Sequence, residues 1–453
     1  MRDFGVYVHI PFCASRCDYC AFATWTDRDE LMEAYVEACR TELARARTDE
    51  RMAPASSVFF GGGTPSRLPP DLLAAILEAV PRRTGAEVTV ECNPEDAAAD
   101  RFASWREAGV TRVSFGVQSM VPHVLAGLGR RHDPASVATA VSLAGEAGFD
   151  SVNVDLIFGG AGETDGDWRG TLESALALEP APPHVSAYAL TVEPGTPLAL
   201  DPARHPDEDT LAGRYEEADR ILTGAGYRWY EVSNWARPGH ECRHNRLYWD
   251  QGDYRGIGCA AHSHRAGRRW WNLRTPERYI AAVTAGHPTM AAEELLTDDQ
   301  RRFEGLALAL RTADGIPEES LPDLPELEGL VERRAGRAVL TVRGRLLANE
   351  VTTRLDPTAL LRTVPVEVTD DLLLATPPVP LDLLARNGKL GIVVHVDEGT
   401  QGPDDDGDRI VGNGRPVTGD EEGQALLDGP TRLLLDHHDV EVVPQLAPVG
   451  EHL

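Results

Sequence analysis

The chain is short of basic charge, and Lys389 is its only lysine. A formal net charge of −28 leaves no basic excess for displacing counterions from a nucleic acid, so we expect neither RNA nor DNA as a partner. No apolar run reaches the about 18 residues of a membrane-spanning helix, and no charged and then apolar segment opens the chain as a signal peptide would. These absences predict a cytoplasmic protein without a transmembrane segment.

Cysteine is scarce as well, with seven residues in all. Four of them are scattered along the chain: Cys39, Cys92, Cys242 and Cys259. An odd number without regular spacing is not a disulfide framework and favours a reducing compartment. The other three, Cys13, Cys17 and Cys20, lie within eight positions directly after an apolar run, in YVHIPFCASRCDYCAF.

Short β-branched runs recur along the first half of the chain, and a helical pattern such as LMEAYVEACRTELARAR separates each from the next. The runs span residues 6–10, 57–60, 87–91, 112–117, 151–157 and 184–190. Ala108-Gly109 and Ala147-Gly148 are typical helix ends before the next strand. Alternation of this kind predicts an α/β fold with parallel strands and right-handed crossovers, here a partial (β/α)6 barrel.

Polar, thiol and glycine residues follow the carboxyl ends of these predicted strands, where barrel chemistry is found. In strand order they are the three cysteines, Gly61-Gly62-Gly63-Thr64-Pro65, Glu91, Gln118, Asp155 and Tyr188-Ala189. We expect these residues to meet at one end of the barrel.

The predicted barrel takes up residues 1–200, and the chain after it divides by composition into three parts. Residues 201–293, rich in tryptophan and tyrosine, form an extension over one side of the barrel. Residues 294–356 read as a winged-helix-like α+β module that ends in a hairpin, RAVLTVRGRLL. Residues 357–453, with prolines and a DDDGD run, form an acidic extension of unknown role.

Three interpretations compete for the clustered cysteines. A structural zinc site needs four closed ligands, and only three lie close together here. A redox pair would leave Cys13 unexplained. A [4Fe-4S] cluster is normally held by four thiolates, so three would leave one iron with a free coordination position.

The spacing C-x3-C-x2-C, followed by GGGTP after the second strand, resembles the radical S-adenosylmethionine (SAM) enzymes. The resemblance implies that SAM chelates the iron that lacks a cysteine. The glycines allow the backbone to approach such a ligand closely, whereas a plain tight turn is the alternative reading.

Over roughly residues 5–356 the chain is similar to oxygen-independent coproporphyrinogen III oxidase and its relatives. The matching blocks are YVHIPFCASRCDYC, FFGGGTPS, ECNPE, SFGVQS, LGRRHD, NVDLIFG and HNRLYWDQGDYRGIG. The resemblance implies that Cys13, Cys17 and Cys20 bind the cluster. It implies SAM contacts from Tyr7, Tyr19, Gly62, Gly63, Thr64, Glu91, Gln118, Arg130, Asp155 and Ala189. For Arg130 the adjacent Arg131 is an alternative.

Three features separate the oxidases from the haem chaperones of the same family. The oxidase motif has a further cysteine two positions after the third, where this chain has Phe22, and the oxidases tend to carry a segment ahead of the first strand. The chaperones carry the His-Asn-x-x-Tyr-Trp pattern present here as HNRLYW. By this resemblance His244 is an axial haem ligand, with Cys242, His262 and His264 as rivals.

We therefore expect a cytoplasmic haem chaperone that carries a [4Fe-4S] cluster and SAM. Its partners would be haem and haem-acceptor proteins, including acceptors at the membrane. The alternative is an oxygen-independent coproporphyrinogen III oxidase that decarboxylates two propionates.

Overall fold

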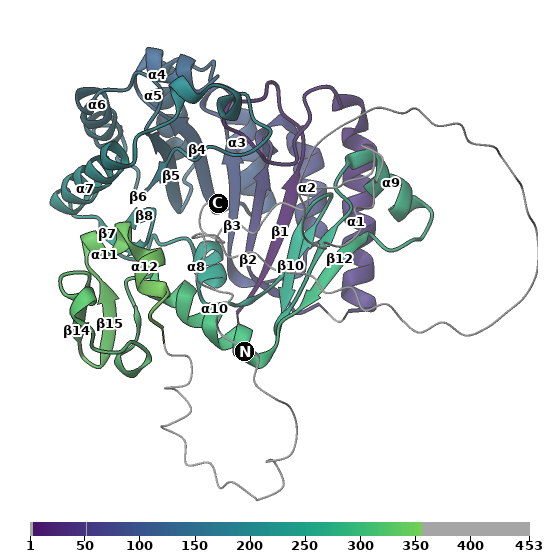
Figure 1. Ribbon diagram of the computed structural model, residues 1–453. Helices are drawn as coiled ribbons and strands as arrows, with labels where there is room; N and C mark the ends of the chain where they lie inside the picture. The colour runs from purple at the N-terminus through teal and green to yellow at the C-terminus, as the bar shows by residue number, and fades with distance from the viewer. Residues whose placement is uncertain (1–2, 51, 356–453) are drawn as a thin grey trace, which may run out of the picture. The chain divides into compact units, whose positions relative to one another are not determined.

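A computed structural model describes residues 3–50 and 52–355, which belong to one compact unit (Figure 1). The predicted acidic extension, 357–453, lies outside the described residues. No helix in the two described ranges has both the length and the apolar character needed to cross a membrane.

Six parallel strands lie side by side in chain order at the centre of the sheet. They are β1 (Phe4–Ile10), β2 (Ala55–Gly62), β3 (Arg82–Cys92), β4 (Arg112–Gln118), β5 (Ser151–Phe158) and β6 (His184–Ala189). The helices between and after them are α1 (Met32–Thr48), α2 (Pro70–Ala79), α3 (Ala99–Ala108), α4 (Pro122–Gly127), α5 (Pro134–Glu146), α6 (Asp165–Leu176) and α7 (Glu208–Gly224). The predicted α/β fold of the partial-barrel type is confirmed.

Further strands extend this sheet at both edges, to twelve strands in all. Beyond β1 lie β9 (Asp253–Ile257), β10 (His262–Arg265), β11 (Arg268–Asn272) and β12 (Met290–Leu295), and beyond β6 lie β8 (Asn234–Ala236) and β7 (Arg228–Glu231). Of these, β9 runs parallel to β1, and the others pair antiparallel. Residues 201–293 thus add to the sheet on both sides of the six-stranded part.

The two faces of the central strands differ in chemistry because successive side chains of a strand point to opposite faces. On the outer face, residues such as Val8, Phe60 and Phe115 are fully buried in one apolar core with the helices. On the inner face the alternate positions are mostly polar, as at Ser114 and Asn153. The inner face is therefore the side on which polar groups gather.

Local sequence explains how the helices end and begin. Gly109 follows α3 with a left-handed φ of 99°, as the predicted Ala-Gly ending requires. Thr164 starts α6 with a capping box, in which its side chain accepts from the backbone N–H of Asp167 and the Asp167 carboxylate accepts from that of Thr164. These signals fix where α3 ends and where α6 begins.

Two short helices belong to the later part of the chain, α8 (Arg243–Trp249) and α9 (Pro276–Thr284). Helix α8 packs on the inner face against the first halves of β1 and β2, whereas α9 packs against α1 (Figure 1). The first half of the inner face is thus covered by α8.

The C-terminal module has its own small core around Leu310, Ile316 and Val351. Its elements are α10 (Asp298–Leu310), β13 (Ile316–Pro317), β14 (Val331–Arg334), β15 (Arg337–Leu340), α11 (Val342–Leu346) and α12 (Ala348–Thr352). The prediction of a hairpin within RAVLTVRGRLL was wrong: the hairpin pairs β14 with β15, and Thr341 then caps a helix. Thr341 ends the strand because its hydroxyl accepts from the N–H of Gly344.

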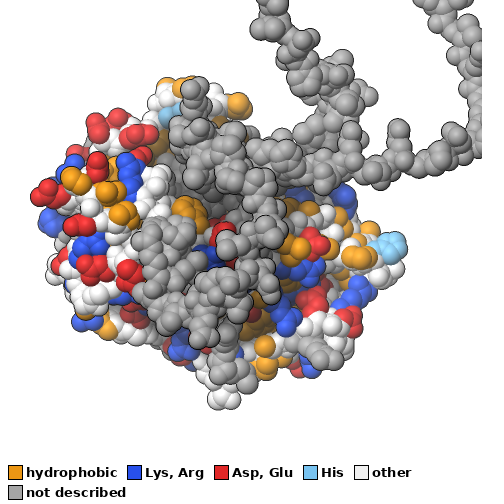
Figure 2. Space-filling model, turned by 60° about the horizontal axis from the view of Figure 1, so that its bottom comes forward, with side chains coloured by type: hydrophobic (Ala, Val, Ile, Leu, Met, Phe, Trp, Pro, Cys, Tyr) orange, Lys and Arg blue, Asp and Glu red, His pale blue; other side chains and the backbone are white. Residues whose placement is uncertain are grey.

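The surface visible in Figure 2 carries acidic, basic and hydrophobic side chains interspersed among the described residues. The described side chains that this view leaves visible form no single broad basic field of the kind that holds a phosphate backbone.

Candidate cofactor site

The cysteine loop follows β1 and is fixed at both ends. The N–H of Cys13 donates to the carbonyl of Trp25 at 3.0 Å, and the N–H of Trp25 donates to the carbonyl of Pro11 at 2.8 Å. Cys13 is buried, Cys17 and Cys20 are half-buried, and all three are free thiols. The loop therefore holds three unpaired thiols at the carboxyl end of the first strand.

The glycine loop after β2 packs directly against the cysteine loop. The N–H of Gly63 donates to the carbonyl of Ile10 at 2.8 Å, and the N–H of Thr64 donates to that of Phe12 at 2.9 Å. A Cβ on Gly63 would lie 2.8 Å from the oxygen of Ile10, so only glycine permits this approach. The Thr64 hydroxyl donates to the sulfur of Cys13 at 3.5 Å. The two motifs thus form one surface.

Arg130 points into this surface, whereas Arg131 is exposed. One guanidinium nitrogen of Arg130 lies 3.6 Å from the sulfur of Cys17, and the other donates to Asn93 Oδ1 at 2.8 Å and to the carbonyl of Gly116 at 2.7 Å. Its Nε is buried without a partner, and among residues 3–50 and 52–355 it pairs with no carboxylate. Between the two adjacent arginines, the structure favours Arg130 as the one that can meet an anionic ligand here.

Two carboxyl groups lie on inner strands of the sheet, Glu91 next to the last residue of β3 and Asp155 within β5. Burial raises the pKa of Glu91 to about 8, and the nearby Asp155 carboxylate adds to this shift. Burial also raises the pKa of Asp155, although Ser114 Oγ and Asn153 Nδ2 donate to it at 2.7 and 2.8 Å and oppose the shift. No arginine or lysine of the described residues pairs with Glu91, so its carboxyl is available to a hydroxyl or an ammonium group.

Gln118, Tyr7, Tyr19 and Ala189 complete the predicted SAM set. Gln118 ends β4 in a left-handed conformation, φ 63°, which a non-glycine residue rarely adopts and which often marks a functional position. Tyr7 is half-buried on β1 with its hydroxyl 3.1 Å from His9 Nδ1. Tyr19 packs against the small apolar cluster that contains Leu128 and Leu190, and Ala189 is exposed at the end of β6. Of the predicted SAM residues, Tyr7 and Asp155 lie within strands and Arg130 follows α4, whereas the others lie at strand ends or in the adjoining loops.

His244 lies apart from these residues, on α8 over the first half of the inner face. Its side chain is fully buried, with Nδ1 2.9 Å from Ser57 Oγ and Nε2 2.9 Å from the Tyr248 hydroxyl. Burial lowers its pKa to about 3, so the ring is neutral at physiological pH. The Glu87 carboxylate accepts from the N–H groups of Arg243 and His244 and fixes the start of the helix. An iron bond from either ring nitrogen would have to displace one of these partners.

A buried polar network that the sequence did not reveal lies on the inner face below Asp155. Asn153 Oδ1 lies 2.5 Å from His184 Nδ1, and His184 Nε2 lies 2.9 Å from the Tyr230 hydroxyl. Asn245 Nδ2 donates to Tyr230 at 3.3 Å and to Glu231 at 2.8 Å. Asn153 and Asn245 belong to the matching blocks NVDLIFG and HNRLYWDQGDYRGIG. His184 and Tyr230 lie in no such block, so no motif of the sequence indicated their part in the network.

The three thiols are not placed to bind a single metal ion together. In the described part of the chain, no group of three or more His, Cys, Asp or Glu side chains is placed to hold one metal ion. This counts against the zinc interpretation. An iron-sulfur cluster binds each thiolate at a different iron, so it does not need the thiols to converge on one point.

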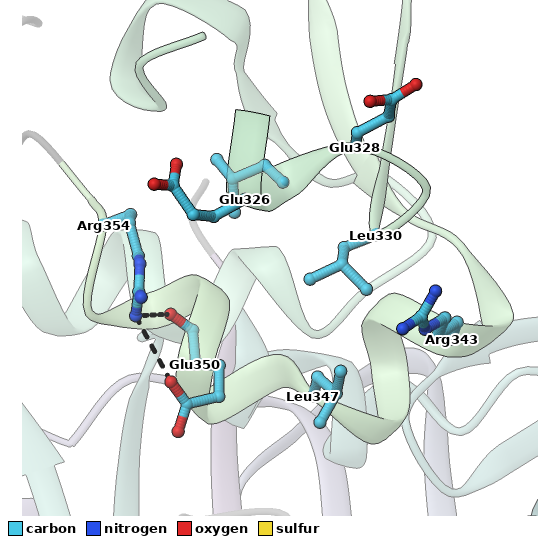
Figure 3. Close-up of a pocket in the computed structure, with 8 residues that line it drawn as sticks. Glu326, Glu328, Leu330, Arg343, Leu347, Glu350 and Arg354 are labelled. Atoms are coloured by element: carbon cyan, nitrogen blue, oxygen red, sulfur yellow. Dashed lines mark hydrogen bonds and ion pairs between the residues drawn. The ribbon is translucent and has the colours of Figure 1, made fainter. Parts of the chain in front are cut away.

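The C-terminal module contains a separate hollow of about 250 Å³ (Figure 3). Leu330 and Leu347 lie between charged side chains there, and Glu350 pairs with Arg354 at 3.3 Å. None of the residues predicted to bind a cofactor lines this hollow.

Comparison with known proteins identifies the family. Residues 7–175 match the model of the Radical SAM superfamily. "Heme chaperone HemW" of Mycobacterium tuberculosis is 42% identical over 77% of this chain and 94% of the relative, and that of Bacillus subtilis is 32% identical over 77% and 97%. The chain belongs to the HemW family. This confirms the assignment of the chain to the haem-chaperone branch.

Among solved structures, coproporphyrinogen III oxidase (HemN) from Escherichia coli, a radical SAM enzyme, matches with a TM-score of 0.68 and 23% identity. The match covers 78% of this HemW-family chain and 89% of that enzyme. At this identity it shows a shared fold alone.

Membership of the radical SAM superfamily implies SAM and a [4Fe-4S] cluster. The observed residues fit both groups. Three free thiols leave one iron of such a cluster without a thiolate, and Arg130 has no carboxylate of its own beside them. The glycine loop against the thiols leaves backbone groups close to the place where SAM would lie.

Proposed function

We propose that this chain binds haem and transfers it to haem-requiring acceptor proteins. The observation that carries the proposal is the match to the M. tuberculosis heme chaperone over nearly that protein's whole length. Phe22 supports it, since the oxidases resembled by this chain have a cysteine at that position. The Phe22 side chain is 39% exposed beside the cysteine loop and offers no thiol there.

In this proposal Cys13, Cys17 and Cys20 hold the [4Fe-4S] cluster, and the residues at the strand ends hold SAM. Arg130 would meet the methionyl carboxylate through its planar fork, and Asp155 and Glu91 would accept or donate hydrogen bonds at hydroxyl or ammonium groups. When bound and reduced, such a cluster would supply the single electron that reductive cleavage of SAM requires. The protein's own part is to position the two groups and exclude water.

We further propose a cytoplasmic location, because unpaired thiols that hold a cluster require a reducing compartment. Acceptor proteins at the cytoplasmic face of the membrane fit this location. The domain limits 1–200, 201–293 and 294–356 are retained as a proposal for the described residues.

His244 remains a predicted haem ligand. Its ring would have to leave Ser57 or Tyr248 before a nitrogen met iron, so ligation by His244 requires α8 or the ring to move.

The test is a haem titration of the anaerobically reconstituted protein, followed by Soret absorbance. We expect stoichiometric binding, and recovery of activity when the haem-loaded protein is mixed with the apo form of a haem enzyme. Absence of haem binding, together with decarboxylation of coproporphyrinogen III in a porphyrin product assay, would overturn the proposal in favour of the oxidase.

A further inference from the structure

Two residues between the second and third predicted cluster cysteines tie the cysteine loop to distant parts of the chain. The N–H of Asp18 donates to the carbonyl of Leu128 at 3.2 Å, and the carbonyl of Asp18 accepts from the N–H of Leu198 at 3.0 Å. Tyr19 packs against the small apolar cluster to which Leu128 and Leu198 both belong. This part of the loop is therefore held from two sides.

Arg204 adds an ion pair to these contacts. It ends the short turn η5 (Pro202–Arg204), and one of its guanidinium nitrogens lies 2.8 Å from Asp18 Oδ2 and 2.5 Å from the carbonyl oxygen of Gly127, to which it donates. The side chains of Arg204 and Asp18 are only 24% and 33% exposed, so water screens their attraction less than that of a fully exposed pair. A single side chain thus joins three segments that are far apart in the sequence.

Gly129 lets Asp18 approach the end of α4. A Cβ on Gly129 would lie 2.8 Å from Asp18 Oδ1 and 3.0 Å from its backbone nitrogen, so only glycine permits this contact. The next residue along the chain is Arg130, whose guanidinium lies 3.6 Å from the sulfur of Cys17. The same junction therefore fixes a thiol and the arginine predicted to meet SAM.

The junction bears directly on how a cluster is kept. A cluster leaves a protein only when the thiolates around it separate. For the second and third thiols, separation requires the stretch 17–20 to move outward. That movement would break the ion pair of Asp18 with Arg204 and both backbone hydrogen bonds of Asp18.

We propose that Asp18 and Arg204 are positioning residues that keep the cysteine loop closed on the [4Fe-4S] cluster and slow the loss of the cluster. The assignment rests on the proposed role of the three cysteines as cluster ligands. Both residues act through the thiols on either side of Asp18 and not as ligands themselves.

The experiment measures how fast the anaerobically reconstituted full chain loses its cluster absorbance to an excess of an iron chelator. We expect Arg204→Ala and Asp18→Ala each to lose the cluster about threefold to fivefold faster than wild type, the range that one ion pair supports. The double variant should be no faster than either single variant, because each substitution already removes the pair. Arg204→Lys, which keeps the positive charge, should lie closer to wild type.

Arg106→Ala is the matched control. Arg106 of α3 likewise pairs with a carboxylate, that of Asp150 at 3.4 Å, and donates to a carbonyl, that of Val110 at 2.6 Å, but it does so at the amino ends of β4 and β5. Its side chain is 31% exposed, close to that of Arg204. Arg106→Ala should change the urea midpoint of the cluster-free protein about as much as Arg204→Ala does, and leave the rate of cluster loss unchanged.

The other outcomes are distinguishable. Wild-type rates of cluster loss in Arg204→Ala and Asp18→Ala would overturn the assignment and leave the proposed cluster ligands in place. Equal acceleration in Arg106→Ala, or a double variant accelerated by the product of the two single effects, would also overturn it, because the pair would then have no specific role. A wild-type chain that holds no cluster after reconstitution would overturn the cluster role of the cysteines and this assignment together.

Discussion

The two ends of the inner face use polar residues in opposite ways. At the carboxyl ends of the strands, three thiols are free, Arg130 has a buried Nε without a partner, and the pKa of Glu91 is raised to about 8. At the other end, both nitrogens of His244 and of His184 are hydrogen-bonded, and the buried atoms without a partner there include the neutral Asn245 Oδ1 and Trp249 Nε1. Buried polar groups in native proteins are nearly always satisfied, so free thiols beside an unpaired arginine nitrogen favour a ligand site, and fully bonded histidine rings favour a structural role.

This difference changes the interpretation of His244. In the sequence it stands in a motif that suggests ligation, yet in the structure it joins α8 to Ser57, 187 residues earlier in the chain.

The largest expected effect is at the cysteine loop. Cys17→Ala should abolish the cluster, because two thiolates cannot hold it in place. Iron and sulfide content after anaerobic reconstitution measures this. Cys242→Ala, a buried thiol remote from the loop, is the control and should retain the cluster. Normal iron and sulfide in Cys17→Ala would contradict the assignment.

In the hydrogen-bonded network around His184, the expected effect is on the stability of the protein. His184→Ala should lower the free energy of unfolding by about 3 kcal/mol, because it leaves a cavity and removes a partner from both Asn153 and Tyr230. The urea midpoint measures the change. His123→Ala, at a 56% exposed side chain, should shift it by less than about 0.5 kcal/mol. Equal shifts in the two variants would show that the network contributes little.

Adjacent arginines offer the next comparison. Arg130→Ala should weaken SAM binding by about tenfold, as expected for a lost charge-assisted hydrogen bond to a carboxylate. Arg131→Ala, at the exposed neighbour, should leave the SAM affinity unchanged. Isothermal titration of the cluster-loaded protein with SAM measures both. A larger loss in Arg131→Ala would reverse the placement of the two side chains.

The last comparison is a pH dependence of stability that comes from Glu91. Its folded pKa of about 8 exceeds the ordinary value of 4.5, so the folded protein binds more protons than the unfolded chain between these two values. Stability should therefore fall as pH rises through that window, and level off above it. Urea unfolding of the metal-free protein across this range measures the slope. In Glu91→Gln the slope should be smaller, and an unchanged slope would assign it to another group.

The sequence predicted the central strands and the meeting of the cysteine and glycine loops, because both depend on local patterns and on the barrel rule. It did not predict the hairpin of the C-terminal module, since RAVLTVRGRLL alternates like a strand while Thr341 caps a helix within it. Nor did it predict that His244 is buried, because that depends on which face of the sheet α8 covers. The burial of His244 is decided by contacts between residues far apart in the sequence, which local patterns do not reveal.

The most direct test is electron paramagnetic resonance of the reduced, anaerobic protein with and without SAM. If three thiols hold the cluster and leave one iron open, SAM binds that iron, and we predict that saturating SAM changes the spectrum of the reduced [4Fe-4S] cluster. A cluster spectrum that saturating SAM leaves unchanged would contradict an open iron at Cys13, Cys17 and Cys20.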